Sequence, residues 1–317
     1  MEAYVEPHLT WGILTDADRP ELRELREQIA ALDNSVLSGI AAEIDSRRLN
    51  IPEGQAVGGR DPYSTLTAYG INYIASREPL QMFLMGGVHP THRHLSIGTA
   101  LLHWQLSHAV AWRDEHCPGE PLWLGCYAEI GRAGLERVAS RIGFAPTRFY
   151  YDLARDLTKP VHVPAVDGVE LHTFVPSNSE TVRRLHNLCF SSITDTEVAP
   201  ESWADRLAEA TFRPEWSVLA TVDDEVVGYA MSGVDESTDS DGPLYGWTER
   251  FGVHPDHRGK GIAVAMLAAC LNNMRADGCV EAGIGIDTED ESGIATLAEQ
   301  IGYTTRDAVA LLTKVVS

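Results

Sequence analysis

A glycine-rich stretch near residue 260 has the composition of an anion-binding loop. Residues 258–263 read Arg-Gly-Lys-Gly-Ile-Ala and stand between an expected strand and an expected helix. Glycines let the chain turn tightly, so successive backbone N–H groups can converge on one ligand. The start of a helix adds unpaired N–H donors and the positive end of its dipole. We therefore expect this loop to bind a diphosphate, with Arg258 and Lys260 supplying mobile positive charge.

The segment that contains this loop occurs twice. Residues 87–102 align without a gap with residues 252–267, and a second pair, 138–144 and 297–303, follows in the same order. Two matched segments in one order indicate a duplicated domain. A chain of 317 residues is also long for one compact core. We expect an N-terminal domain over 1–157, a Pro- and Val-rich linker over 158–168, and a C-terminal domain over 169–317.

Apolar spacing and turn residues give the order of elements in each copy. In the second copy, strands are expected at 169–175, 216–222, 225–234, 245–253, 281–286 and 308–315, with helices at 180–189, 261–275 and 293–301. The first copy has the same plan, with helices at 20–31, 97–113 and 130–142, a hairpin across 55–75, and strands at 81–88 and 122–127. The fold class is therefore a mixed α/β (α+β) arrangement repeated twice.

The loop resembles the diphosphate-binding pattern R/Q-x-x-G-x-G/A of the GNAT acetyltransferase superfamily. Arg258, Gly261 and Ala263 fill its three defined places, and the resemblance extends through 290–293 and the pair 302–303. It implies two tandem GNAT folds, each with a mostly antiparallel central sheet flanked by helices, in which strands four and five splay apart. The cofactor implied is acetyl-CoA, with no metal.

The resemblance also implies which residues hold coenzyme A. The pantetheine arm would lie along the backbone of Phe251, Gly252 and Val253, and Asp290 takes the place of a family asparagine. The cofactor-binding residues implied are Phe251, Gly252, Val253, Arg258, Gly259, Lys260, Gly261, Ile262, Ala263 and Asp290.

Glu249 is the candidate general base. It stands where many family members carry a carboxylate, and it lies four residues before Val253, on the same face of a regular strand. The alternative is an ordinary strand glutamate. The usual family tyrosine, the acid for the departing thiolate, is replaced by Ala298. The acid would then be Tyr229, Tyr245, Tyr303 or a solvent molecule.

The first copy departs from the pattern at three places. His94 and Ser96 stand where the second copy has Gly259 and Gly261, and Leu84 stands at the place of Glu249. A loop without glycines is less able to bring its N–H groups onto a diphosphate. We expect this copy to be catalytically silent and to shape the acceptor pocket or bind coenzyme A without reacting.

The tandem layout resembles mycothiol synthase and related two-domain acetyltransferases, in which the C-terminal copy acts. The resulting hypothesis is an N-acetyltransferase that moves an acetyl group to a primary amine of a small, cationic metabolite or natural product. Two alternatives stay open. One is a non-catalytic coenzyme A-binding module, and the other is a protein or peptide N-acetyltransferase.

Composition bounds the partners. The formal net charge of −21 repels nucleic acid and anionic membrane and favours a cationic partner, although an acidic surface also serves solubility alone. The first residues carry no signal-peptide pattern, so a cytoplasmic location is expected, as a monomer or homodimer. The five cysteines form no C-x-x-C pair, which predicts reduced thiols and neither a disulfide framework nor a zinc site.

Overall fold

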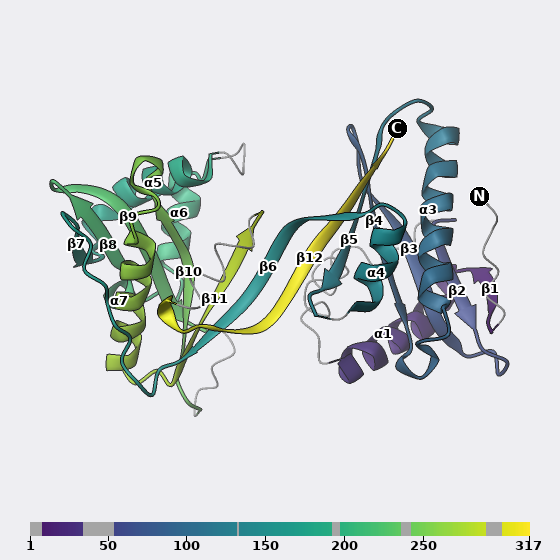
Figure 1. Cartoon of the computed structure of the whole chain (residues 1–317), viewed down its shortest axis with the longest axis horizontal. Coiled ribbons are helices and arrows are strands. Elements are labelled where there is room, and N and C mark those ends of the chain that lie inside the picture. The colour runs from purple at the N-terminus through teal and green to yellow at the C-terminus, as the bar shows by residue number, and fades with distance from the viewer. Residues whose placement is uncertain (1–7, 34–53, 132, 192–196, 236–241, 290–299) are drawn as a thin grey trace. The chain divides into compact units, whose positions relative to one another are not determined.

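The fold was analysed in a computed structural model of the chain (Figure 1), which describes residues 8–33, 54–131, 133–191, 197–235, 242–289 and 300–317. The contacts divide the chain into two compact units. The first comprises residues up to Tyr150 together with Asp307–Ser317, and the second comprises Tyr151–Arg306. The division at 157 and 169 expected from the sequence remains a proposal, because the contact-based units assign the last residues differently.

The first unit has a sheet with the strand order β1-β2-β3-β4-β5-β12. Its strands are β1 (Thr10–Ile13), β2 (Ala56–Arg60), β3 (Leu66–Arg77), β4 (Leu80–Val88), β5 (Leu122–Glu129) and most of β12 (Thr304–Val316). Its α-helices are α1 (Arg19–Asp33), α3 (Ile97–His116) and α4 (Ala133–Arg141).

The second unit has a sheet with the order β7-β8-β9-β10-β11-β6. Its strands are β7 (Glu170–Thr173), β8 (Val218–Val222), β9 (Glu225–Val234), β10 (Tyr245–Val253), β11 (Glu281–Thr288) and the second half of β6 (Ala145–Asp156). Its α-helices are α5 (Ser179–Phe190), α6 (Pro200–Leu207) and α7 (Ile262–Ala276). The described part of the expected helix at 293–301 is limited to its last two residues.

Each copy's last strand continues into the sheet of the other unit. Strand β12 pairs antiparallel with β5 along Val309–Val316, inside the first unit. Strand β6 reaches the second unit, where Leu153 and Leu157 are buried and the Leu157 N–H donates to Val280 O over 2.9 Å. The two copies have therefore exchanged equivalent strands, which the sequence does not indicate.

The fourth and fifth strands of each copy are paired at one end and separate toward the other end. Strands β10 and β11 are parallel neighbours from Tyr245 to Thr248, and the pairing ends there although both strands continue. Strands β4 and β5 likewise pair only from Gln81 to Phe83. The predicted splaying of these strands is confirmed, and beyond Thr248 one edge of β10 has no strand partner among the described residues.

Two helices cover opposite faces of the second sheet. Met266 of α7 packs against β9 at Gly228, whereas His186 of α5 contacts Tyr229, the next residue of β9. Neighbouring residues of a strand point to opposite faces, so α5 and α7 lie on opposite sides. Strand β9 is accordingly apolar and almost continuously buried, as expected of a strand covered on both faces.

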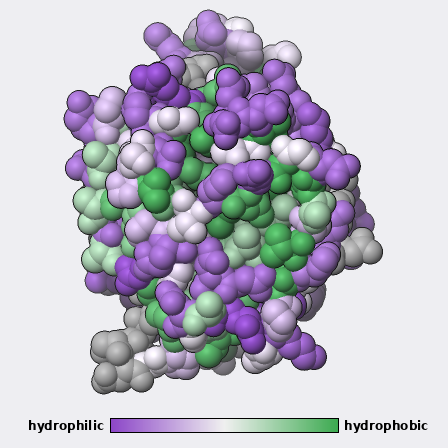
Figure 2. Space-filling model, turned by 90° about the vertical axis from the view of Figure 1, so that its left-hand side faces the viewer, coloured by the Kyte–Doolittle hydropathy of each residue, from purple (hydrophilic) through white to green (hydrophobic). Residues whose placement is uncertain are grey.

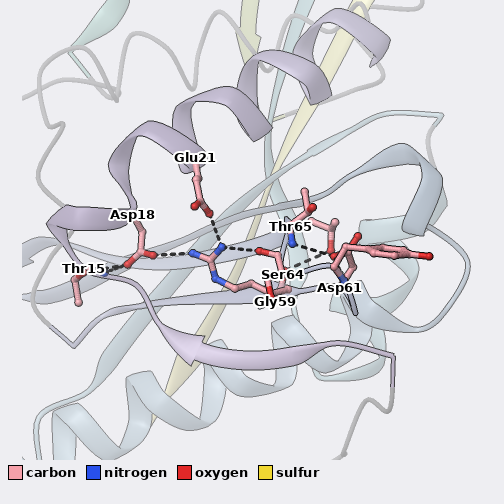
Figure 3. Close-up of polar contacts among 10 residues, drawn as sticks. Thr15, Asp18, Glu21, Gly59, Asp61, Ser64 and Thr65 are labelled. Atoms are coloured by element: carbon pink, nitrogen blue, oxygen red, sulfur yellow. Dashed lines mark hydrogen bonds and ion pairs between the residues drawn. The ribbon is translucent and has the colours of Figure 1, made fainter.

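A guanidinium fixes the first helix of the first unit to its sheet. Arg60 at the end of β2 donates to Asp18 over 2.7 Å and also pairs with Glu21 of α1 (Figure 3). The same side chain donates to the Ser64 carbonyl in the following turn over 3.0 Å. Hydrogen bonding to these groups raises the pKa of Arg60, so this anchor stays charged.

The side of the second unit that faces the viewer in Figure 2 is mainly hydrophilic, with apolar side chains gathered in patches near its middle. All five cysteines are free thiols, as expected. In the described part of the chain, no helix combines the length and the apolar character needed to cross a membrane.

Candidate functional site

A β-bulge in β10 positions the candidate base. The antiparallel register with β9 runs regularly up to Thr248 opposite Ser232 and resumes with Arg250 opposite Met231, so Glu249 is the extra residue. A bulge redirects the side chains around it. A Cβ built on Gly233 of β9 would lie 3.0 Å from Glu249 Oε1, so the carboxylate lies over this strand.

The bulge also changes which face Glu249 occupies. Gly233 lies on the same face of β9 as Tyr229, the face covered by α5. Gly252 of β10 faces α5 as well, since a Cβ there would meet Tyr229 and Cys189 at 2.8 and 3.0 Å. Val253 must then face the other way. The expectation that Glu249 and Val253 share a face is wrong, because the extra residue shifts the alternation by one.

The open edge of β10 presents backbone groups of alternate residues. The His254 N–H donates to Val227 O of the neighbouring segment, which fixes the alternation of the ladder. Gly252 is therefore hydrogen-bonded toward β9, and Phe251 and Val253 direct their N–H and C=O groups to the open side. Of the three residues expected along the pantetheine arm, these two can pair with an extended ligand.

The expected diphosphate loop has the geometry of an anion cradle. Gly259 and Gly261 have φ angles of +76° and +83°, and Gly261 is the N-cap of α7. The first helical N–H with a partner is that of Ala265, which donates to Gly261 O. The N–H groups ahead of it, including those of Ile262 and Ala263, have no intrahelical acceptor. A Cβ at Gly259 would meet nothing within 4 Å, so the space beside the loop is open.

The two basic residues of the loop differ. Lys260 is exposed. Arg258 Nε donates to Val253 O over 3.1 Å, and its Nη2 donates to Cys189 O at the end of α5 over 2.9 Å. Arg258 therefore ties the loop to β10 and α5, rather than carrying a fully mobile charge. Its direct contact with a diphosphate remains a prediction.

A small, solvent-open depression lies beside Glu249. Its lining comes from α6, from the segment before β8, and from β9 and β10. The lining residues are Trp203, Arg206, Leu207, Phe212, Met231, Glu249 and Arg250. Both residues at the bulge thus line one space, which a regular strand would place on opposite faces. Sequence analysis missed Arg206, Arg250 and Trp203, because no spacing rule links residues on α6 to a bulge.

A buried polar pair stands behind this region. His186 Nδ1 and the Tyr229 hydroxyl share a hydrogen bond of 2.6 Å. Burial, and then the charge of Arg206, lower the pKa of His186, while burial raises the pKa of Tyr229. Both side chains are therefore neutral near pH 7, and they form a rigid support under β10 at Gly252.

The remaining candidates are placed only in part. Asp290 and Ala298 lie outside the described residues. Tyr303 is buried beside Thr248, near the point where β10 and β11 separate, and burial raises the pKa of its hydroxyl. Tyr229 is fully enclosed, whereas Tyr245 at the start of β10 is half-buried. None of the three is identified as the acid, and that role stays a prediction.

Comparisons with known proteins agree with this geometry. A model of the "Acetyltransferase (GNAT) family" matches residues 179–303. A protein of Frankia alni named "Mycothiol acetyltransferase" is 26% identical over 313 residues, covering 92% of this chain and 90% of its own. The chain is an N-acetyltransferase whose residues 179–303 match the GNAT family. The family match spans the glycine loop, the bulged strand and the wedge between β10 and β11.

A further relative of the acetyltransferase carries the same name. The "Mycothiol acetyltransferase" of Stackebrandtia nassauensis is 29% identical over 296 residues and is covered to 87% of its length. Similarity over most of both chains means that the relatives share both copies, and not the C-terminal copy alone.

Solved structures show the same fold for the acetyltransferase. A GCN5-related N-acetyltransferase from Sphaerobacter thermophilus aligns with a TM-score of 0.64 at 22% identity, covering 98% of this chain and 97% of its own. A tandem GNAT protein from the clavulanic acid biosynthesis pathway aligns with a TM-score of 0.50 at 16% identity, covering 97% and 98%. The predicted tandem GNAT fold is confirmed.

Proposed function

We propose that the C-terminal copy transfers an acetyl group from acetyl-CoA to a primary amine of a small, cationic molecule. The observation that carries this proposal is the open edge of β10. It leads from the N-terminus of α7 to Glu249, with the backbone groups of Phe251 and Val253 directed along it. From Val253 to the bulge at Glu249 the strand rises about 10 Å, a span suited to an extended arm between a diphosphate and a thioester.

The reaction needs a neutral amine and a positioned thioester. In the proposal, the carboxylate of Glu249 accepts a proton from the substrate ammonium, directly or through a water. The amine nitrogen attacks the thioester carbonyl, the C–N bond forms, and the C–S bond breaks. The nitrogen loses its second proton to solvent as the amide forms, and the sulfur leaves as thiolate and takes a proton from solvent or from a tyrosine hydroxyl. Positioning and backbone donors to the carbonyl oxygen supply most of the rate.

Two observations support a small, cationic acceptor, one for its charge and one for its size. The net charge of −21 favours a cationic partner, and the relatives named for mycothiol act on a small molecule by name. The first copy is proposed to be silent, because β4 pairs with β3 without a bulge at Leu84, which stands at the place of Glu249. Its positive-φ loop residues are His94 and Ser96.

Calorimetric titration of acetyl-CoA tests the proposal. The unmodified protein should bind with one site, and Gly261→Glu should abolish that site by placing a carboxylate in the cradle. Gly261→Ala distinguishes blocking of the anion site from backbone strain. It imposes the strain of a side chain at a φ of +83° but adds only a methyl group, so the anion site stays open. Ser96→Glu, the matched change in the first copy, should leave binding intact.

The outcomes distinguish the classes of function. Failure of the unmodified protein to bind acetyl-CoA contradicts the proposal altogether. Binding without acetylation of any member of an amine panel leaves a coenzyme A-binding module. Loss of a second site in Ser96→Glu would show that the first copy binds the cofactor too.

A further inference from the structure

Trp247 lies at the point where β10 and β11 separate. It pairs with Gly283 of β11, and the pairing of the two strands ends one position later. A Cβ on Gly246 would meet a methionine of α7, so Gly246 faces α7 and Trp247 faces the α5 side. The indole is therefore on the same face of the sheet as the carboxylate of Glu249, two residues along the strand.

Two glycines of β11 lie next to the indole, and they differ in what requires them. A Cβ on Gly283 would collide with the six-membered ring of Trp247, so a side chain there is incompatible with this position of the indole. Gly285 is exposed and has no positive φ angle, and a Cβ there would lie 3.5 Å from Trp247 Cζ2, an ordinary contact. Glycine weakens a strand, and an unforced one is typical of a place that a ligand approaches closely.

The first copy has an aromatic residue at the comparable place. Phe83 of β4 pairs with Gly125 of β5, where the pairing of these two strands ends. It shares a face with Met85, which packs with the cluster around α1. Phe83 aligns in sequence with Thr248, but the bulge in β10 shifts the alternation by one residue. Trp247 is therefore the counterpart of Phe83 on this face.

A second ring covers Phe83 in the first copy. Tyr127 of β5 stacks on Phe83, with ring centroids 5.8 Å apart and 9° between the ring planes. Gly285 of β11 has the position, relative to the paired glycine of its strand, that Tyr127 has in β5. Trp247 is half-buried, and no aromatic ring of the described residues contacts it. The second copy thus has an indole without the ring that completes the stack in the first copy.

The indole lies where the proposed reaction places the acceptor. Two residues of a strand span about 7 Å, so a group on the indole of Trp247 and an amine at Glu249 are joined by a short spacer. Aromatic rings pack against each other with centroids about 4.5–7 Å apart, and this contact adds to the burial of their apolar surface. The absence of a side chain at Gly285 leaves room for such a ring.

We infer that Trp247 is a specificity-determining residue, and that the acceptor carries a flat ring joined to its amine by a short alkyl spacer. The ring stacks on the indole next to Gly285, in the position that Tyr127 has in the first copy, and the amine lies at Glu249. This inference rests on the proposed acetyl transfer to an amine and names the class of that amine.

Three amines test the inference on the full chain with acetyl-CoA. Phenethylamine has a flat ring, cyclohexylethylamine has a ring of the same size that is not flat, and hexylamine is linear. Release of coenzyme A should show a kcat/KM about 10-fold higher for phenethylamine than for either of the others. Trp247→Leu should remove most of this preference through KM, whereas Trp247→Phe, which keeps a flat ring, should retain most of it.

A second variant imitates the first copy. A tyrosine in Gly285→Tyr is expected to stack on Trp247 as Tyr127 stacks on Phe83, and so to remove the preference for phenethylamine by raising its KM. Gly285→Ala adds only a methyl group in ordinary contact and should keep the preference. Phe83→Leu is the matched control in the first copy and should leave the preference unchanged.

The outcomes separate the inference from the proposed function. If hexylamine or cyclohexylethylamine is used as efficiently as phenethylamine, or if Trp247→Leu lowers kcat/KM equally for all three amines, the inference is wrong although the proposed function stands. If Trp247→Leu does not fold, the comparison of Gly285→Tyr with Gly285→Ala decides in the same way. If no amine is acetylated, calorimetric titration of the three amines into the protein with acetyl-CoA decides, and equal affinities or no binding overturn the inference.

Discussion

The two copies keep the same loop backbone with different residues, and they differ where the chemistry is proposed. His94 and Ser96 have φ angles of +63° and +62°, close to those of Gly259 and Gly261. The expectation that glycines are needed for this backbone is therefore too strict, although a non-glycine residue there costs about 1–2 kcal/mol. The backbone shape of the loop is the same in both copies, and the first copy carries side chains where the second has glycines.

The fourth strands differ more. Strand β4 pairs with β3 in an unbroken register through Leu84 and Met85, whereas β10 has its bulge at the equivalent place. In the first copy, Leu84 packs into the core that includes α3, and Met85 packs with the cluster around α1. In the regular strand, these two residues therefore pack into two different hydrophobic cores. In the bulged strand, both residues line one depression. A single inserted residue therefore distinguishes the strand that only supports the fold from the strand that contributes to the candidate site.

A third difference lies under the strand. Arg26 of α1 interacts with Tyr69 of β3, at the places that His186 and Tyr229 occupy in the second copy. Burial raises the pKa of both tyrosines. The partner of the first tyrosine is a permanent cation, and the partner of the second is a neutral, titratable ring.

The largest expected effect concerns whether the two copies come apart when the chain is cut between them. A protease site between Asp167 and Gly168, in an exposed part of the linker, would cut the chain between its copies. We expect the fragments to remain associated in gel filtration after cleavage, because each unit contains a strand of the other fragment. Separation into two folded halves in native buffer would contradict the exchange of strands.

The next effect concerns activity. Glu249→Gln should lower kcat by at least about 100-fold, as expected for loss of a general base, with acetyl-CoA affinity unchanged. Glu225→Gln, at an exposed position of β9, should be neutral in the same assay. A Glu249→Gln enzyme with an unchanged kcat would assign Glu249 to the ordinary strand carboxylates and leave the base to another group.

The sequence was sufficient for regular elements and insufficient for irregular ones. Strands 225–234 and 245–253 were predicted with the bounds that β9 and β10 have, because buried alternation and flanking turns mark them clearly. Helix α6 lies between the expected helix at 180–189 and the expected strand at 216–222, where no element was placed. The bulge at Glu249 and the strand exchange depend on which strand each strand pairs with. That pairing is set by contacts between distant segments, and local composition does not indicate it.

A smaller effect should depend on pH. The pKa of His186 is lowered in the folded state, so the unfolded chain takes up a proton first as pH falls below about 6.5. Stability is then fully present above that pH and is lost as pH falls toward the folded-state pKa, by at most about 1.4 kcal/mol per pH unit for one proton. Amide exchange in β9 between about pH 7 and about pH 5 measures this.

The comparison with the first copy supplies the controls. His186→Gln should flatten the pH dependence in β9, whereas His162→Gln, at an exposed position of the linker, should not. Amides of β3, whose tyrosine faces Arg26, should show no such slope. An equal slope in β3 and β9 would place its origin elsewhere.

The smallest effect separates backbone strain from function. Gly259→Ser should destabilise the second unit by about 1 kcal/mol through its φ of +76°. His94→Gly should change the first unit by less, because relief of strain is offset by the freedom that glycine adds to the unfolded chain. Chemical denaturation followed by amide exchange resolves the two units. A larger effect at His94 would show that its side chain, and not its backbone angle, is important there.

The exchange of strands also sets an order of events during synthesis. The ribosome completes the first copy through Tyr150 long before it reaches Asp307, yet the first unit includes residues 307–317. Until then, β5 has an uncovered edge beside Leu122 and Leu124, which are fully buried in the finished fold, and an uncovered edge invites pairing with other chains. The sheet of the first unit is therefore incomplete until the second half of the chain has been translated. How long its edge is exposed to aggregation depends on the rate of that translation.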